Sequence, residues 1–362
     1  GLYLAIEEAD GRFLDTHALS DGNVYKMEGG TGTLGHHGVG AVTNRADLDA
    51  FLGAYQGGAR TESWWREHLN LPAYYAYRAI LESIHHYDIA DGKNYFYYLA
   101  PPGHRWMVIP WDIDLTWADN MYGNGAEPFQ DRVLAQPVFR IEYQNRLREI
   151  RDLLFNRDQG ERLIDECAAI IADPQGGPSP VDADRAKWDY HPVMAPGGKA
   201  GQGLFYQITR SKDFRGMIQL MKDYVTKRSA WVDQSLLTDP KIPDTPTVRF
   251  TGEPGFPPQG LKFRASLYQG THSFAVREWR LAEVAPPPAH AGRLTAPGRY
   301  EIIPVWESGE QTQDIIEIRL PSAAVTPDRT YRVRGRVKDT TGRWSHWSAP
   351  VEFAAGPAAA NR

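Results

Sequence analysis

Polar side chains of the types that serve phosphoryl transfer are concentrated between residues 88 and 114. Asp88 is followed by Asn94, and Asp112 and Asp114 come after two apolar runs. An acid, then an amide, then a further acid would place a proton acceptor and two metal ligands around one point. This order of residue types predicts a phosphoryl-transfer site.

Asp112 and Asp114 are two positions apart, so their carboxylates would share one face if the strand before them continues. In a poorly solvated site their repulsion would reach several kcal/mol unless a cation offsets it or one acid stays protonated. Magnesium prefers one or two carboxylates plus phosphate oxygens, and would suit the pair. The alternative is structural: one acid begins an exposed turn and the other caps residues 116–117.

Two strands and a helix are expected to position these groups. The runs Asn94–Leu99 and Trp106–Trp111 are apolar and β-prone, and the chain-reversing segment 100–104 between them predicts a hairpin. Apolar residues at helical spacing predict a buried helix over Pro72–Tyr87, which Asn70 would cap. Asp88 then stands where a helix ends and a loop begins, a common place for a catalytic group.

Lys26 follows the short β-prone run Asn23–Tyr25, so its side chain is expected to project from a sheet. Glycines 30, 32 and 35 then show a G-x-G-x-x-G spacing that could cradle phosphate oxygens. No helix is predicted directly after Gly35, because the next one begins near Asn44, and a surface loop is therefore the favoured interpretation. A solvated lysine is the alternative for Lys26.

Composition indicates a folded protein. The chain has 362 residues, is 42% hydrophobic and 23% charged, and can bury enough apolar surface for two domains. Its net charge of -5 is spread thinly, without a basic stripe, which argues against a nucleic-acid partner. No apolar run reaches the roughly 18 residues that a membrane span needs. The single cysteine, Cys167, falls on an apolar helical stripe and is expected in the core.

The pattern changes near Asp239. Helices are predicted over 140–154, 159–172 and 214–237, with a long loop over 173–209. Seven β-prone runs follow, and their spacing predicts a β-sandwich. They lie near 247–251, 261–268, 274–284, 300–305, 315–320, 331–338 and 351–353. The run Tyr331–Arg336, followed by Trp344-Ser345-His346-Trp347-Ser348, resembles a fibronectin type III domain in which arginines stack between tryptophans in a stabilising ladder.

Four segments of the first part resemble the CotH family, spore-coat-type kinases with a divergent protein-kinase fold. They are Gly1–Glu7, Tyr25-Lys26, Lys93–Tyr97 and Ile109–Thr116, and the Pro-Trp-Asp-x-Asp-Leu-Thr run within the last is the most specific. The resemblance covers about the first 235 residues. Because the chain begins inside an expected strand and lacks an upstream segment usual in this family, the first lobe is expected to be incomplete.

The resemblance implies a role for each site residue. Asp88 is the expected catalytic base, with Asp91 as an alternative, and Asn94 and Asp112 are the expected metal ligands. Asp114 would be an alternative or supporting ligand. Lys26 would pair with the nucleotide phosphates, and Glu7 at the end of the opening strand would pair with Lys26. The implied cofactors are ATP and Mg²⁺.

The expected organisation is α+β: a kinase-like domain over 1–239, a fibronectin type III-like β-sandwich over 240–356 and a tail over 357–362. The expected function is phosphorylation of Ser or Thr on a surface or secreted protein, and the resemblance implies export to the cell envelope or beyond. The alternative is a surface-binding protein whose kinase-like domain transfers nothing. The substrate protein and the oligomeric state are left open.

Overall fold

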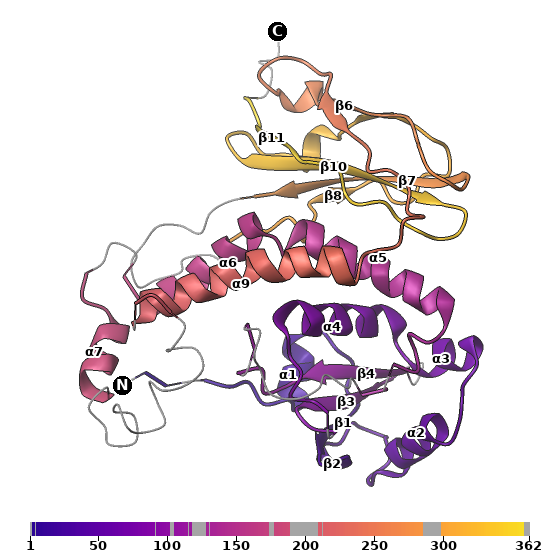
Figure 1. Ribbon diagram of the computed structural model, residues 1–362, viewed down its shortest axis with the longest axis vertical. Coiled ribbons are helices and arrows are strands. Elements are labelled where there is room, and N and C mark those ends of the chain that lie inside the picture. Colours follow the sequence, from indigo (N-terminus) through magenta and orange to yellow (C-terminus); the bar gives the residue numbers. More distant parts are fainter. Residues whose placement is uncertain are drawn as a thin grey trace. The chain divides into compact units, whose positions relative to one another are not determined.

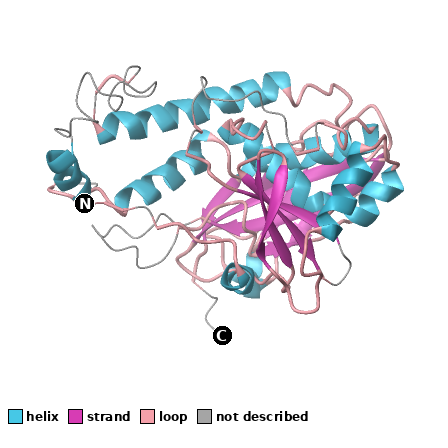
Figure 2. Cartoon of the chain, turned by 90° about the horizontal axis from the view of Figure 1, so that it is seen from below, coloured by secondary structure: helices cyan, strands magenta, loops and turns pink. Residues whose placement is uncertain are grey.

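The computed structural model describes residues 2–3, 5–90, 92–101, 105–114, 116–117, 128–129, 131–173, 177–188, 209–211, 213–284 and 298–357. Helices and antiparallel sheets are both abundant in these ranges (Figure 2), so the predicted α+β class is confirmed. The chain folds into two compact units, Leu2–Leu147 and Arg148–Arg362. The domain boundary predicted near Asp239 rests on a change in the sequence pattern, and it stays a prediction.

Four antiparallel strands form the sheet of the Leu2–Leu147 unit. The strands are β1 (Asn23–Glu28), β2 (Thr31–His36), β3 (Tyr95–Ala100) and β4 (Arg105–Pro110), in the order β2-β1-β3-β4. Strand β3 is interior, because Tyr97 pairs with Tyr25 on one side and with Val108 on the other. The β3–β4 hairpin confirms the pair of strands predicted around the candidate site.

Helices α1 (Gly11–Thr16), α2 (Ala46–Gln56), α3 (Glu62–His68) and α4 (Leu71–Ile84) accompany this sheet, and α4 and α3 pack against β4 (Figure 1). The predicted helix before Asp88 is α4. The side chain of Asn70 caps it by accepting a hydrogen bond from the backbone N–H of Ala73 at 3.2 Å.

Aromatic rings fill the space between this sheet and its helices. Phe51 of α2 stacks on Trp106 of β4 with ring centroids 4.9 Å apart. Phe129 is fully buried and meets Tyr55 and Tyr74 edge to face. On the other side of the sheet, Val24, Phe96 and Tyr98 form a smaller cluster with Leu14 of α1. Both faces of β1 and β3 are therefore covered, and the strands are fixed in place.

Two predictions about the start of the chain are wrong. Residues 5–8 have no strand conformation, because the sheet is complete without a strand from this segment. The glycine-rich segment is largely a strand, β2, instead of a surface loop. Gly29 and Gly30, with φ of 57° and 78°, make the tight β1–β2 turn in the left-handed conformation that glycine adopts without strain.

The Arg148–Arg362 unit begins within helix α5 (Pro137–Leu153) and continues with α6 (Arg157–Ala169), α7 (Pro180–Trp188) and α9 (Phe214–Ser235). Three of these were predicted, whereas α7 lies inside the predicted long loop. Cys167 is exposed, so its predicted place in the core is wrong; the buried residues on this helix include Ile164 and Glu166.

Seven strands complete the unit: β5 (Val248–Phe250), β6 (Lys262–Ala265), β7 (Phe274–Glu283), β8 (Trp306–Glu307), β9 (Glu317–Arg319), β10 (Thr330–Asp339) and β11 (Val351–Ala354). They form two sheets, β5-β6-β9 and β11-β10-β7-β8, around one apolar core that includes Phe263, Trp279 and Phe353. Four strands fall within their predicted runs, and β10 and β11 extend one residue beyond theirs. The run 300–305 instead turns at Tyr300, whose carbonyl accepts from the N–H of Ile303, and the strand starts at Trp306.

The predicted ladder forms around Arg336. Its guanidinium lies between the rings of Trp344 and Trp347, 4.2 and 4.3 Å from their centroids. Helix α5 contacts the same segment: Arg148 donates to the carbonyl of Trp344 at 3.0 Å, and Asp152 accepts from the backbone N–H of Trp347 at 2.8 Å. Burial lowers the pKa of Arg148 to about 10. The tryptophan segment therefore anchors the β-sandwich to a helix of its own unit.

Candidate functional site

The loop that follows α4 carries the first candidate residue. His85 ends the helix in the left-handed conformation, with φ of 60°, and the backbone N–H groups of His85 and His86 both donate to the carbonyl of Leu81. Ile89 is buried, which fixes the loop from below. Asp88 thus follows a capped helix end, and 22% of its side chain is exposed.

Asp88 and Asn94 contact each other directly. The amide nitrogen of Asn94 donates to the backbone carbonyl of Asp88 at 2.7 Å and to its Oδ2 at 3.0 Å. The other carboxylate oxygen, Oδ1, pairs with the ammonium of Lys93 at 2.9 Å. Asn94 itself has a φ of 63°, a left-handed conformation that asparagine tolerates better than most residues. The carboxylate of Asp88 is therefore held in one orientation from both sides.

Asp112 reaches this cluster from the end of β4. The backbone N–H of Trp111 donates to the carbonyl of Asn94 at 3.1 Å, which brings the two chain segments together. The strand ends at Pro110, and Asp112 has a φ of 54°, so the premise that Asp112 and Asp114 share one face of a continuing strand is wrong. Both side chains are exposed, and neither has an ion-pair partner among the residues that the structure describes.

A buried histidine, His86, comes two positions before Asp88. His86 is fully buried, and neither ring nitrogen has a hydrogen-bond partner of good geometry within the described part of the chain. Burial lowers the pKa of His86, and the backbone of Asn94 and of Trp111 and the charges of Asp88 and Asp112 oppose that shift. The hydrogen bond from Trp111 to Asn94 places the segment of Asp112 beside Asn94, and the charges of Asp88 and Asp112 both act on the imidazole of His86.

The β1–β2 turn closes against the same loop. The backbone N–H of Gly30 donates to the carbonyl of Gly92 at 3.1 Å. Gly92 has a φ of 67°, and a Cβ added there would come within 2.7 Å of the Cα of Gly30. Only glycine fits this close approach, so the turn and the Asp88–Asn94 loop are matched to each other.

Lys26 and Glu7 do not form the ion pair with each other that the sequence predicts, because each pairs with another residue. Lys26 forms an ion pair with Glu28 at 2.8 Å, and Glu7 contacts His17 at 3.0 Å. Lys26 pairs in register with Phe96, whose ring meets Trp111 edge to face. The lysine therefore projects from the same sheet face as Phe96, on which Trp111 packs, whereas Glu7 lies on a segment outside the sheet. The Lys26–Glu7 pair is replaced by two other pairs.

The donor set fits a magnesium ion with ligands supplied by a nucleotide. Because Nδ2 of Asn94 is used by Asp88, the oxygen of that amide is directed away from Asp88 and is available as a ligand. Asp112 adds an exposed carboxylate. No group of three or more His, Cys, Asp or Glu side chains is gathered for a metal among the described residues. Such a site would depend on phosphate oxygens and water, as magnesium sites often do.

Two residues were missed as site residues by the sequence reasoning. Lys93 begins one of the segments that resemble the CotH family but was given no role, yet it is the cation beside Asp88. His86 falls within the predicted helix Pro72–Tyr87, yet the helix ends at Ile84 and the side chain of His86 is fully buried in the loop that follows. The signal for Lys93 was its position next to Asn94. Asp91, the alternative base, lies outside the described residues.

Comparison with known families finds a match over most of the chain. The sequence model of the family described as CotH kinase protein matches residues 1–232, well over half of the chain. The chain belongs to the CotH kinase protein family. The family match contains every candidate site residue, from Glu7 to Asp114. No curated protein matches the chain. In the described part, no helix has the length and apolar character needed to cross a bilayer.

Proposed function

We propose that the chain is an ATP- and Mg²⁺-dependent protein kinase that phosphorylates Ser or Thr side chains. The observation that carries this proposal is the contact of Asn94 with Asp88, at 2.7 and 3.0 Å, beside the segment of Asp112. In this proposal the loop supplies the base and one oxygen donor for a metal, and the end of β4 supplies the second donor. Membership of the CotH kinase protein family supports the same reaction class.

In this proposal Asp88 receives the proton of the acceptor hydroxyl. The hydroxyl oxygen forms a bond to the γ-phosphorus, the bond from that phosphorus to the β,γ-bridging oxygen breaks, and ADP leaves with the electron pair. The two contacts from Asn94 and Lys93 orient the carboxylate for this role. When bound, Mg²⁺ would offset the negative charge of the phosphates, and Asn94 and Asp112 would hold it, with Asp114 as an alternative ligand.

Lys93 and Lys26 are the cations of this proposal. Lys93 lies beside Asp88 and would meet the negative charge of the phosphoryl group as it is transferred. Lys26 is half exposed and would steady the nucleotide phosphates after leaving Glu28, a surface pair that contributes little stability. Glu7 has no part in the proposed chemistry, because it contacts His17 instead of Lys26.

Phosphate transfer from labelled ATP to a dephosphorylated, Ser-rich acceptor protein tests this function. The full chain should incorporate phosphate in the presence of Mg²⁺. Asp88→Asn should lower the rate by about 10²-fold or more, which is the usual contribution of a general base. Asp15→Asn, an exposed acid of α1, makes the same change in charge elsewhere and should leave the rate unchanged. Equal rates for the Asp88 variant and the parent would reject Asp88 as the base.

The second candidate function is binding without transfer. It is favoured by the sandwich of strands β5–β11, which resembles a fibronectin type III domain in its two sheets of three and four strands. In the kinase proposal, too, the sandwich is a fibronectin type III-like domain. The substrate there is a surface or secreted protein, and the chain is exported before it phosphorylates that substrate. Fractionation of cells that produce the chain tests the location, and failure to bind ATP would leave the binding function alone.

A further inference from the structure

The outer face of the three-stranded sheet in the Arg148–Arg362 unit is strongly cationic. Arg249 of β5 lies directly opposite Arg264 of β6, and Lys262 of β6 lies opposite Arg319 of β9. Glu317 of β9 is the acid among these strand positions; it lies opposite Arg264 and forms its ion pair with Lys262, at 2.8 Å. This arginine face, defined by Arg249, Arg264 and Arg319, therefore carries an excess of positive charge in a chain whose net charge is -5.

The arginines of this face differ from the others of the sandwich. The other described arginines between 248 and 357 each have a carboxylate oxygen within 4.0 Å; they are 277, 280, 299, 329, 332, 334, 336 and 343. Arg249, Arg264 and Arg319 have no such pair within the described ranges, although the charge of Glu317 is felt by Arg264. Arg249 and Arg264, like Lys262 and Arg319, are like charges directly opposite each other, an arrangement that destabilises a sheet and that a bound anion would relieve.

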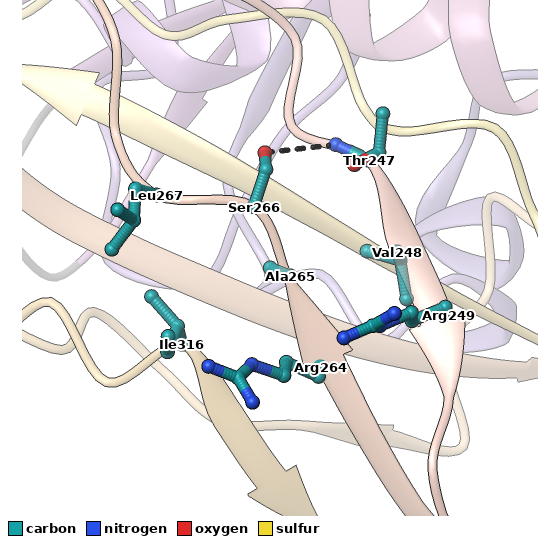
Figure 3. A pocket seen from close by; sticks show the side chains of 8 residues that line it. All are labelled: Thr247, Val248, Arg249, Arg264, Ala265, Ser266, Leu267 and Ile316. Carbon is teal, nitrogen blue, oxygen red and sulfur yellow. Dashed lines mark hydrogen bonds between the residues drawn. The ribbon is translucent and has the colours of Figure 1, made fainter.

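A hollow of about 390 Å³ lies across β5 and β6 beside the two opposed arginines (Figure 3). Arg249 and Arg264 project on the same side of the strands, and Leu267 and Ile316 give the hollow an aliphatic wall. The hydroxyl residues Thr247 and Ser266 form its edge, where the Ser266 hydroxyl accepts from the N–H of Thr247 at 3.2 Å. The residues lining this hollow include no aromatic ring.

We propose that this hollow binds the phosphate of a phosphorylated Ser or Thr in an extended polypeptide. Opposed side chains on neighbouring strands are about 5 Å apart at Cβ, so two guanidinium groups can hold one phosphate between them. Arginine clusters are a recurring means of recognising phosphorylated segments. The aliphatic wall suits an apolar residue next to the phosphorylated one. The lack of aromatic rings disfavours single-stranded nucleic acid, which stacks its bases on such rings.

This binding role goes beyond the proposed kinase function and does not depend on it, because it is measured with synthetic peptides. The full chain is titrated into a fluorescently labelled ten-residue peptide with a central phosphoserine flanked by leucine, at about 0.15 M salt. The matched probe is the same peptide without phosphate. Fluorescence anisotropy should show binding of the phosphorylated form at least about tenfold tighter than of the unmodified form.

Three variants locate the site. The double variant Arg249→Gln, Arg264→Gln should remove the preference for phosphate. The double variant Arg249→Lys, Arg264→Lys keeps the charge but loses the planar fork, and should lose most of the affinity. Arg329→Gln removes an exposed arginine that is paired with Glu283 at 2.7 Å, and should change nothing. Thermal melts of each variant verify that it is folded.

Several results would overturn the proposal. Equal affinity for the two peptides would do so, as would full affinity in the double Lys variant, because simple charge attraction would then suffice. Tighter binding of a sulfated oligosaccharide or a single-stranded oligonucleotide through the same arginines would assign the arginine face to a different polyanion. An equal loss of binding in Arg329→Gln would show that the effect is not local to the hollow.

Discussion

The amide nitrogen of Asn94 donates to both the backbone carbonyl and the carboxylate of Asp88, at 2.7 and 3.0 Å. Two residues that are six positions apart are thereby closed into one loop. These hydrogen bonds orient the carboxylate of Asp88 before a substrate binds. Little free energy is then needed to orient it during the reaction, because protein groups already occupy positions that water would otherwise take.

Asn94→Asp should destabilise the chain. The substitution keeps the size of the side chain and tolerates the left-handed backbone, but it removes both N–H donations and sets a second carboxylate against Asp88. We expect a loss of about 1–3 kcal/mol in the free energy of unfolding in urea. Asn44→Asp is the matched control. Asn44 accepts from the N–H of Ala46, a role that aspartate fills equally well, so its stability should be unchanged.

Gly92→Ala should cost more stability than Gly29→Ala. Both glycines have positive φ, so each substitution carries the strain of a left-handed alanine, about 1–2 kcal/mol. At Gly92 the new Cβ would also meet the Cα of Gly30 at 2.7 Å, whereas at Gly29 it would meet open space. Urea unfolding of the two variants isolates the steric part. Equal losses would show that the turn and the loop are not closely packed.

The pair of Asp239 and Arg343, at 2.6 Å, should stabilise the chain in a pH-dependent way. Burial alone would raise the pKa of Asp239, but hydrogen bonds from Arg343 and from the N–H of Lys241 hold it below its ordinary value of 3.8. A lowered pKa means that the folded state binds fewer protons, so the contribution is complete above about pH 4 and is lost as pH falls further.

The measurement for this pair compares the parent with Asp239→Asn. At pH 7 the variant should be less stable by roughly 1 kcal/mol, and the difference should shrink toward pH 2.5 as the aspartate is protonated. Asp244→Asn, an exposed acid near the same chain segment, should show no such trend. A difference that stays constant with pH would mean that the ion pair contributes nothing.

Arg249→Gln should slightly raise the thermal stability of the chain. Arg249 lies on the edge strand β5 directly opposite Arg264, and like charges in such a position cost roughly 0.2–1 kcal/mol. Arg264 is less suitable for this test, because it also lies opposite Glu317 of β9. Arg329→Gln removes a charge that is paired with Glu283 and should not stabilise. A lower melting temperature for the Arg249 variant would show that this arginine serves the fold instead of a ligand.

Sequence patterns predicted the elements that rest on local signals. The helix that ends before Asp88, the hairpin after Asn94 and most sandwich strands were all found from periodicity and turn residues. The patterns failed where pairing is decided by distant residues. The segment of Glu7 is apolar enough for a strand, but the sheet leaves it unpaired. The glycines around Gly32 suggested a loop, but β1 supplies a partner that makes a strand.

For the candidate site, too, the local sequence signals were predictable and the contacts between distant residues were not. The order of Asp88, Asn94 and Asp112 is visible in the sequence, and the structure brings the first two into contact and the third nearby. The partner of Lys26 was not predictable, because an ion pair between exposed side chains depends on which carboxylate is nearest in space. The burial of His86 was not predictable either, because it depends on how the loop after α4 packs in the folded chain.

Calorimetric titration of the full chain with ATP, with and without Mg²⁺, tests most directly whether Asp88, Asn94 and Asp112 form a nucleotide site. We predict binding that requires Mg²⁺, weakened at least about tenfold by Asp112→Asn and unchanged by Asp15→Asn. Binding of ATP that is the same without Mg²⁺, or the same in the Asp112 variant, would contradict the account, as would no binding at all.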